Sequence, residues 1–123
     1  MDYKIELIPI AVADVDRAKA FYADTVGWPA DFDNTVHQGL RFVQITPPGS
    51  ACSICFGVGL EMLEEGASQY IQVVVADADA AHAELTARGV ECTPVEELPW
   101  GRFVRFEDPD GNRWALQQII RAG

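Results

Sequence analysis

The stretch FVRFEDPDGNRWALQ, residues 103–117, decides the fold of this chain of 123 residues. Its centre, Pro-Asp-Gly-Asn at 109–112, is typical of a tight turn. Proline fixes one φ angle, aspartate and asparagine hydrogen-bond to their own backbone, and glycine accepts a positive φ. Residues that favour strands flank this turn at 103–106 and 114–120. The stretch therefore predicts two strands joined by a hairpin.

A similar pattern occurs earlier in the chain. Residues 41–45 favour a strand and lead through the turn-forming residues 46–50 into a second strand at 51–56. The turn glycines Gly49 and Gly111 are 111 − 49 = 62 residues apart. The chain is therefore interpreted as two copies of one unit.

A helix signal precedes each hairpin at a matching distance. Asp14 is expected to cap a helix over 15–26 that stops at Gly27, and Asp77 to cap a second helix that stops at Gly89. The two caps are 77 − 14 = 63 residues apart. The apolar stripes keep this offset: Val15, Ala18 and Tyr22 in the first helix, and Ala78, Ala81 and Leu85 in the second. The repeated register is strong support for a duplication.

Each unit is predicted to run strand, helix, strand, strand, strand. The remaining strands are expected at 5–12 and 70–76 before the helices, and at 30–33 and 90–94 after them. Neither unit, at about 60 residues, buries a large core alone. We therefore expect one α+β domain over 1–123, with a first module at about 1–60, a glycine-containing linker at about 57–68 and a second module at 69–123.

Composition excludes several classes of protein. Hydrophobic residues at 49% and charged residues at 23% are globular values, and no run approaches the roughly 18 apolar residues of a membrane span. The net charge of −10, from 19 acidic and 9 basic residues, opposes binding to nucleic acid, although it can attract cationic ligands. Residues 1–6 lack the features of a signal peptide, which indicates a cytoplasmic protein whose Cys52, Cys55 and Cys92 stay reduced.

Three motifs together resemble the vicinal oxygen chelate superfamily of glyoxalase I, bleomycin-resistance proteins and extradiol dioxygenases. They are Asp-x-Asp-Arg-Ala-x-x-Phe-Tyr at 14–22 with Gly27-Trp28, Thr-Pro-Pro-Gly-Ser at 46–50, and Phe-x-Asp-Pro-Asp-Gly-Asn-x-Trp at 106–114. The resemblance covers essentially the whole chain. It implies two tandem βαβββ modules that form an open, cup-shaped, mostly antiparallel curved sheet with the helices outside, usually in a homodimer whose subunits share or border the sites.

Strand alternation predicts which side chains line the cup, because successive residues of a strand face opposite sides. The all-aliphatic faces, such as Ile8, Ile10 and Val12, are expected under the helices. The opposite face carries the candidate ligand-binding residues. With Trp100 added as an aromatic near the mouth, these are Leu7, Pro9, Ser53, Cys55, Tyr70, Gln72, Trp100, Ala115 and Gln117.

The resemblance also predicts where a metal would be bound. Metal-dependent members place His, Gln or Glu on the first and last strands of each module, and these four positions fall on Leu7, Ser53, Tyr70 and Ala115. None of these side chains suits a divalent ion, which prefers imidazole or carboxylate. His37 and His82 stand apart in the sequence, and Cys52 and Cys55 would face opposite sides of a strand. We therefore expect no metal and no cofactor.

The polar groups near the predicted cup favour hydrogen bonding over acid–base chemistry. Besides the residues above, Arg41, Arg102 or Arg105 can contribute, depending on which way their strands face. No carboxylate pair, Ser/His/Asp set or glycine-rich phosphate loop can be assembled from them. The aromatics Trp28, Phe32 and Trp100 either stack on a planar ligand or seal the core or a dimer contact.

Two functional hypotheses follow, and a third is plainer. The first is a metal-free homodimeric binding protein that sequesters a small aromatic or cationic natural product, as the bleomycin-resistance branch does in antibiotic resistance. The second is an enzyme of isomerase, lyase or cyclase type that works without the usual metal, with Tyr70, Cys55 or Glu107 as acid or base. The third is a family member without a ligand, whose cup is filled by its own side chains. The sequence leaves open whether the chain is an enzyme.

Overall fold

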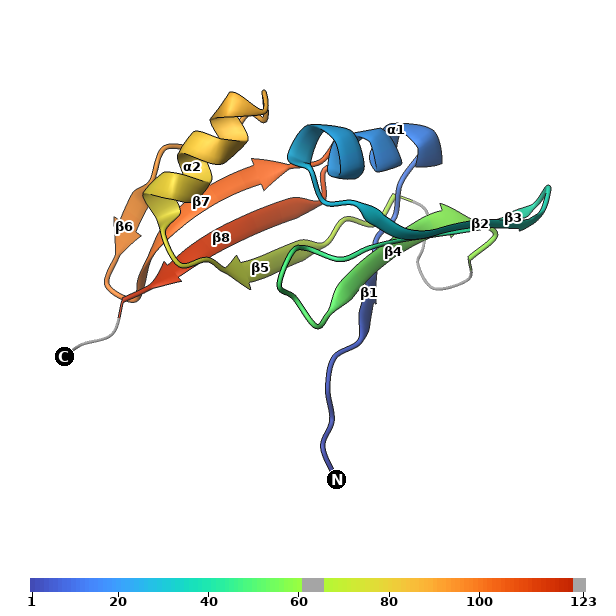
Figure 1. Ribbon diagram of the computed structural model, residues 1–123, viewed down its shortest axis with the longest axis horizontal. Coiled ribbons are helices and arrows are strands. Elements are labelled where there is room, and N and C mark those ends of the chain that lie inside the picture. The colour runs from blue at the N-terminus through green and yellow to red at the C-terminus, as the bar shows by residue number, and fades with distance from the viewer. Residues whose placement is uncertain (61–65, 121–123) are drawn as a thin grey trace. The chain divides into compact units, whose positions relative to one another are not determined.

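The computed structural model describes residues 1–60 and 66–120, and its chain divides into two compact units, Met1–Ser68 and Gln69–Gly123. Each unit has a helical segment and a sheet of four strands (Figure 1). Each sheet contains one parallel and two antiparallel pairings and does not close on itself. The predicted α+β fold with two βαβββ units is confirmed. No helix in the described part of the chain is long and apolar enough to cross a membrane.

Unit 1 contains four strands in the spatial order β1-β4-β3-β2. Its elements, in chain order, are β1 (Leu7–Pro9), α1 (Val15–Lys19), the π-helical segment η1 (Ala20–Val26), β2 (Ala30–His37), β3 (Leu40–Ile45) and β4 (Ser53–Val58). The first strand pairs in parallel with the last, and the other pairings are antiparallel.

Unit 2 repeats this arrangement, with spatial order β5-β8-β7-β6. Its elements are β5 (Tyr70–Val74), α2 (Ala78–Ala87), β6 (Glu96–Leu98), β7 (Gly101–Glu107) and β8 (Arg113–Ile119). The helix α2 packs on β7 and β8 (Figure 1). The open edges of the two sheets are formed by β1 and β2 in one unit and by β5 and β6 in the other.

The helices begin and end where the sequence predicts. The side chain of Asp14 accepts a hydrogen bond from the backbone N–H of Arg17, and Asp77 caps α2 in the same way. Gly27 ends the first helix with a φ of 88°, a conformation that glycine adopts without strain. The structure differs from the predicted regular helix in its second half, which is π-helical. There the Gly27 N–H bonds to the Tyr22 carbonyl five residues back.

The turn at 108–112 is held by a network around two buried side chains. Asp108 accepts hydrogen bonds from the backbone N–H groups of Asp110 and Asn112, at 2.8 and 2.9 Å. The Asn112 amide donates to the other Asp108 oxygen at 2.9 Å, and its carbonyl oxygen accepts from the N–H of Gln69 at 2.9 Å. Gly111 has the positive φ, 82°, that the sequence predicts. The same turn therefore joins β7 to β8 and fixes the residue that precedes β5.

Each sheet has one face under its helix, which we call the helix face, and an opposite face, which we call the open face. In unit 1 the helix face carries Ile54 and Phe56, and the Tyr22 ring packs on Phe56 with ring centroids 6.0 Å apart. In unit 2, Phe106 and Trp114 are register partners on this face, and their rings stack at 6.1 Å. The predicted aliphatic residues, including the buried Ile10 and Ile71, also lie on the helix faces.

Several predicted boundaries need correction. The strand expected at 90–94 is absent: only Cys92 forms an isolated bridge, with Phe106, and the edge strand of unit 2 is β6 instead. The strand expected at 5–12 is reduced to β1, whereas the strand expected at 30–33 extends through β2. The predicted linker at 57–68 begins inside β4, and its residues 61–65 lie outside the described part of the chain.

Candidate functional site

The open face of unit 2 brings together polar and aromatic side chains in three rows across β5, β8 and β7. Register partners share a face, so the rows follow directly from the strand pairing. Row one is Tyr70, Arg113 and Glu107; row two is Gln72, Ala115 and Arg105; row three is Val74, Gln117 and Phe103. The four candidate residues on β5 and β8 therefore lie together on one surface.

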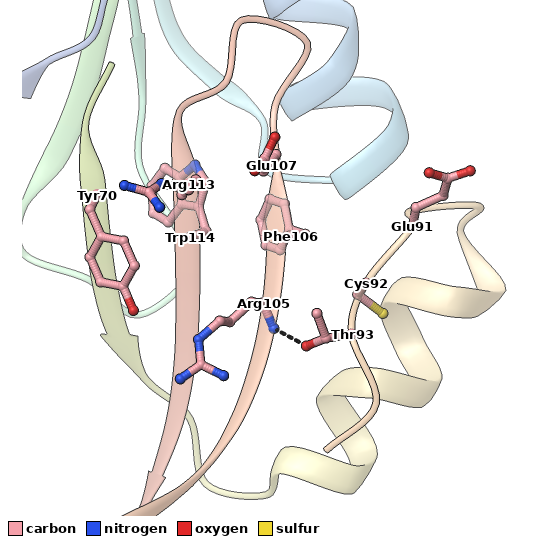
Figure 2. Close-up of a pocket in the computed structure, with 9 residues that line it drawn as sticks. All are labelled: Tyr70, Glu91, Cys92, Thr93, Arg105, Phe106, Glu107, Arg113 and Trp114. Atoms are coloured by element: carbon pink, nitrogen blue, oxygen red, sulfur yellow. Dashed lines mark hydrogen bonds between the residues drawn. The ribbon is translucent and has the colours of Figure 1, made fainter. Parts of the chain in front are cut away.

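A pocket of about 570 Å³ borders row one of this face (Figure 2). Its lining residues are Tyr70, Glu91, Cys92, Thr93, Arg105, Phe106, Glu107, Arg113 and Trp114. Figure 2 shows the side chains of Arg105 and Arg113 extending toward the strand that carries Tyr70, while the segment after α2 contributes Glu91 to Thr93 on the other side. The volume lies within the range of small-molecule sites, which is about 300–1,000 Å³.

The two arginines of the pocket rest on aromatic rings. The guanidinium carbon of Arg113 lies 5.5 Å from the centroid of the Tyr70 ring, and that of Arg105 lies 4.9 Å from the centroid of Phe103. Both distances fit cation–π contacts. Arg105 also makes one long contact of 3.4 Å with Glu96. The Tyr70 side chain remains 49% exposed, so a ligand can reach its ring.

A chain of amides fixes the rest of the open face of unit 2. The Gln72 amide donates to the Gln117 side-chain oxygen at 2.6 Å, and the Gln117 amide donates to the backbone carbonyl of Trp100 at 3.2 Å. Gly101 leaves the space for this arrangement, because a Cβ atom there would lie 2.7 Å from the Gln117 amide nitrogen. Trp100 thus contributes its carbonyl to this network, while its side chain is 59% exposed and borders no part of the described pocket.

The open face of unit 1 has different chemistry. Strand pairing places the candidate residues Leu7, Pro9, Ser53 and Cys55 together on it. A hydrogen-bonded cluster occupies this face: Thr46 bonds to Ser53 at 2.6 Å and to Asp31, and Gln44 donates to Ser53 at 3.3 Å. Ser53 is only 4% exposed, so the cluster satisfies its own polar groups.

Cys55 lies on the candidate face but has no exposed surface. Burial raises the pKa of its thiol, which keeps the sulfur protonated and a poor nucleophile. The pKa of Cys52 is also raised, by burial first and then by the charge of Glu6. The Cys52-x-x-Cys55 spacing therefore lacks the features of a redox pair, because Cys55 is buried and the pKa of each thiol is raised.

The strand register of the two units differs by two residues from the sequence offset used to transfer the metal-ligand positions. On β4, Ser53 lies beside Leu7 of β1, but on β8, the matching Ala115 lies beside Gln72, while Tyr70 lies beside Arg113. The offset between the first strands is therefore 72 − 7 = 65 residues, not 63. An even shift keeps the same face, so the candidate set is unchanged.

Even with Gln72 in place of Tyr70, the side chains at these positions do not fit a divalent ion. They are an aliphatic chain, a hydroxyl, a methyl group and one amide that is already bonded to Gln117. Across residues 1–60 and 66–120, no group of three His, Cys, Asp or Glu side chains is arranged to hold a metal. Hard and borderline ions prefer such ligands.

Sequence alone did not determine which face of the sheet Arg41, Arg102 and Arg105 occupy. The structure places Arg41 and Arg102 on the helix faces. Arg41 forms ion pairs with Asp16 and Asp33, and Arg102 pairs with Asp79 at 2.8 Å. Hydrogen bonds from Arg41 first and Lys19 second hold the pKa of Asp33 well below its usual range. The pairs of Arg41 with Asp16 and of Arg102 with Asp79 join helix to sheet, whereas the pair of Arg41 with Asp33 joins β3 to β2.

The histidines and the aromatics of unit 1 lie outside the described pocket. His37 is exposed and its Nδ1 accepts a hydrogen bond from the Gly39 N–H, while His82 is half-buried on α2. Trp28 stacks on the buried Tyr22, with ring centroids 6.2 Å apart, and Phe32 is 53% exposed on β2.

The residues that wall the pocket on the side away from Tyr70 were not predicted as site residues from the sequence. Thr93 accepts a hydrogen bond from the Arg105 N–H through its hydroxyl, which places the segment after α2 against β7. Glu91 has no periodic pattern or turn chemistry around it that marks it as a pocket residue. Arg113 could have been predicted to lie on the open face, because it follows the predicted turn and precedes Ala115 by two residues on the same strand.

The fold matches one family. The sequence model of the Glyoxalase/Bleomycin resistance protein/Dioxygenase superfamily matches residues 4–116, and the chain belongs to this superfamily.

Several proteins of known sequence or structure are similar over nearly their whole length. TnmS3 of Streptomyces sp. CB03234, described as an antibiotic binding protein, is 31% identical, with a TM-score of 0.82 over 97% of this chain and 98% of its own. A superfamily member from Sphaerobacter thermophilus DSM 20745 is 34% identical, with a TM-score of 0.78 over 95% and 98%. Uncharacterized protein YetH of Bacillus subtilis strain 168 is 23% identical over 94% of this chain and 98% of its own length.

Proposed function

We propose that this protein binds a small aromatic natural product in the pocket on the open face of unit 2, without a metal ion, and that it acts by sequestration. The observation that carries the proposal is the pocket itself: a cavity of about 570 Å³ with the half-exposed Tyr70 ring and two arginines in its wall. The similarity to the antibiotic-binding TnmS3 supports the same class of function. We further propose that the protein is a cytoplasmic homodimer.

The polar groups of this face suit recognition more than catalysis. Gln72 and Gln117 are held by hydrogen bonds in one orientation, so their remaining donors and acceptors are fixed before a ligand arrives. Such preorganisation reduces the entropy lost on binding. The aromatic ring of Tyr70 provides apolar area for a flat ligand.

Calorimetric titration of EDTA-treated protein with a panel of aromatic antibiotics tests the proposal. We expect saturable binding by at least one compound, with the same affinity before and after EDTA treatment. The variant Tyr70→Ala should weaken binding by about twofold to tenfold, because ring contacts contribute about 0.5–1.5 kcal/mol. The control Tyr3→Ala, at an N-terminal residue that is 91% exposed, should leave the affinity unchanged. Tight stoichiometric binding of a divalent metal, or no saturable binding across the panel, would overturn the proposal.

A second candidate function is metal-independent catalysis in the same pocket. It is favoured by one observation, that Tyr70 and Glu107 stand on either side of Arg113 in row one. An acid and a base so placed can move protons on one ligand. Loss of turnover in Tyr70→Phe with retained binding would support this function, whereas unchanged bound compound after prolonged incubation would support binding alone. Cys55 is not a candidate here, because it is fully buried.

A further inference from the structure

We propose that the pocket of unit 2 selects ligands that carry an acidic group on a flat aromatic ring, with Arg113 and Arg105 binding the acidic group and Tyr70 contacting the ring. This inference rests on the proposed function and names the class of ligand for it. It differs from the cationic alternative that the acidic composition left open.

Arg113 is the first of the two anion-binding groups. Its guanidinium is positioned over the Tyr70 ring at 5.5 Å. In the part of the chain that the structure describes, no carboxylate lies within ion-pair distance of it, although Glu107 is its register partner on β7. An arginine presents donors in a planar fork that matches a carboxylate. Arg113 therefore keeps its side-chain donors available for a ligand.

Arg105 is the second anion-binding group, and it lies within reach of the same acidic group of the ligand. Arg105 is the register partner of Ala115, so it is the diagonal neighbour of Arg113 on the open face. Diagonal neighbours on adjacent strands are about 7–8 Å apart, which long side chains span. Ala115, which neighbours both arginines on this face, has only a methyl group. The single 3.4 Å contact between Arg105 and Glu96 leaves most of the guanidinium donors unused.

The acidic residues near the pocket do not cancel this preference. Glu91 and Glu107 also line the pocket, so its formal charge is balanced. The arginines, however, are held on aromatic rings, while neither glutamate forms an ion pair among the described residues. The net charge of −10 is spread over the whole chain and acts at long range, where salt screens it beyond about 8 Å. Contact with the guanidinium groups therefore dominates selectivity.

Three probes with one ring system test the charge preference directly. They are 2-naphthoate, neutral 2-naphthamide and the cationic 2-naphthylmethylammonium, titrated calorimetrically into EDTA-treated protein at pH 7 and 150 mM salt. We expect 2-naphthoate to bind about tenfold more tightly than 2-naphthamide, because a charge-assisted bidentate contact exceeds a neutral one by roughly this factor. The cationic probe should bind most weakly.

Charge variants identify the residues that select the anion. Arg113→Gln should reduce the affinity for 2-naphthoate to that for 2-naphthamide, while 2-naphthamide binds as before and so reports an intact site. Glu107→Gln should raise the affinity for 2-naphthoate by about twofold to threefold, because it removes a neighbouring negative charge. The matched control Arg88→Gln removes the same charge from an exposed position at the end of α2 and should change neither affinity.

The outcomes separate this inference from the proposed function. Equal affinity for the three probes, or a preference for the cation, overturns the selection of acidic ligands but leaves a binding pocket. Failure of all three probes while a natural product binds also overturns this inference, and leaves the proposed function standing. Failure of the probes and of the antibiotic panel overturns both.

Discussion

The variant Asn112→Ala removes the side chain that connects the turn at 108–112 to the start of β5. In the wild-type protein, the fully buried Asn112 amide donates to Asp108 and accepts from the Gln69 N–H, both at 2.9 Å. Alanine provides neither group. The Gln69 N–H and one oxygen of the buried Asp108 then each lose a hydrogen bond, while both groups stay where they are.

The expected loss of unfolding free energy is about 3 kcal/mol. The buried Asp108 oxygen left without this partner costs about 1–3 kcal/mol, and the partly buried Gln69 N–H adds a smaller cost. For a domain of this size, that loss corresponds to a fall in Tm of about 12 °C, at roughly 4 °C per kcal/mol. Urea unfolding at a fixed protein concentration measures the change, and the Gln69 amide should exchange with deuterium faster than in the wild type.

The control is Asn34→Ala, which removes the same amide from an exposed position in β2. It should change stability by no more than about 0.5 kcal/mol. A loss below about 1 kcal/mol for Asn112→Ala, or an equal loss for the control, would refute the claim that Asn112 anchors β5 and the Tyr70 position that follows Gln69.

Three further predictions follow from single contacts. Arg41 holds the pKa of Asp33 below its unfolded-state value, so the stabilisation is present above that value and is lost as pH falls through the folded-state pKa; in urea melts, Asp33→Asn should cost about 0.5–1 kcal/mol at pH 7, and the cost should shrink below about pH 4. Gly101→Ala should displace the Gln117 amide, whose nitrogen would lie 2.7 Å from the new Cβ, and cost about 1–3 kcal/mol by thermal melting; an unchanged Tm would contradict this. Cys55 is fully buried and its pKa is raised, so iodoacetamide at pH 8 should leave it unmodified in the native protein and alkylate it in urea, as mapped by mass spectrometry; native labelling would show that the strand opens.

The parts of the fold that sequence predicts correctly are those decided by neighbouring residues. The caps Asp14 and Asp77 bond to N–H groups three residues ahead, and Gly111 adopts the φ that its turn requires. These interactions form within one short segment, so the residue types alone indicate them.

The parts that sequence missed depend on contacts between segments. The register of β5 is fixed by its pairing with β8, which places Gln72 beside Ala115 and Tyr70 beside Arg113. Likewise β6 forms because Glu96 pairs with Phe103, although its own sequence has no apolar alternation. A sequence offset between two copies is not a strand register, since one unit can lose two residues between strand and cap.

In the candidate site, too, local patterns predict some features and contacts between segments decide the others. Alternation places Tyr70, Gln72, Ala115 and Gln117 on one face of unit 2, as the pairing register has them. The segment after α2 forms one wall of the pocket, and its position depends on the long-range hydrogen bond between Thr93 and Arg105. No local sequence pattern predicts this bond. The distances of the two arginines from their rings also come only from the folded structure.

Metal-independent binding on the open face of unit 2 is tested most directly by two-dimensional NMR titration of EDTA-treated, isotope-labelled protein with 2-naphthoate. We predict saturable shifts that are largest at the amides of Tyr70, Arg105 and Arg113, and that are unchanged when Mg²⁺ or Zn²⁺ is added. Shifts that arise only after a divalent metal is supplied, or that concentrate at residues outside the pocket lining, would contradict it.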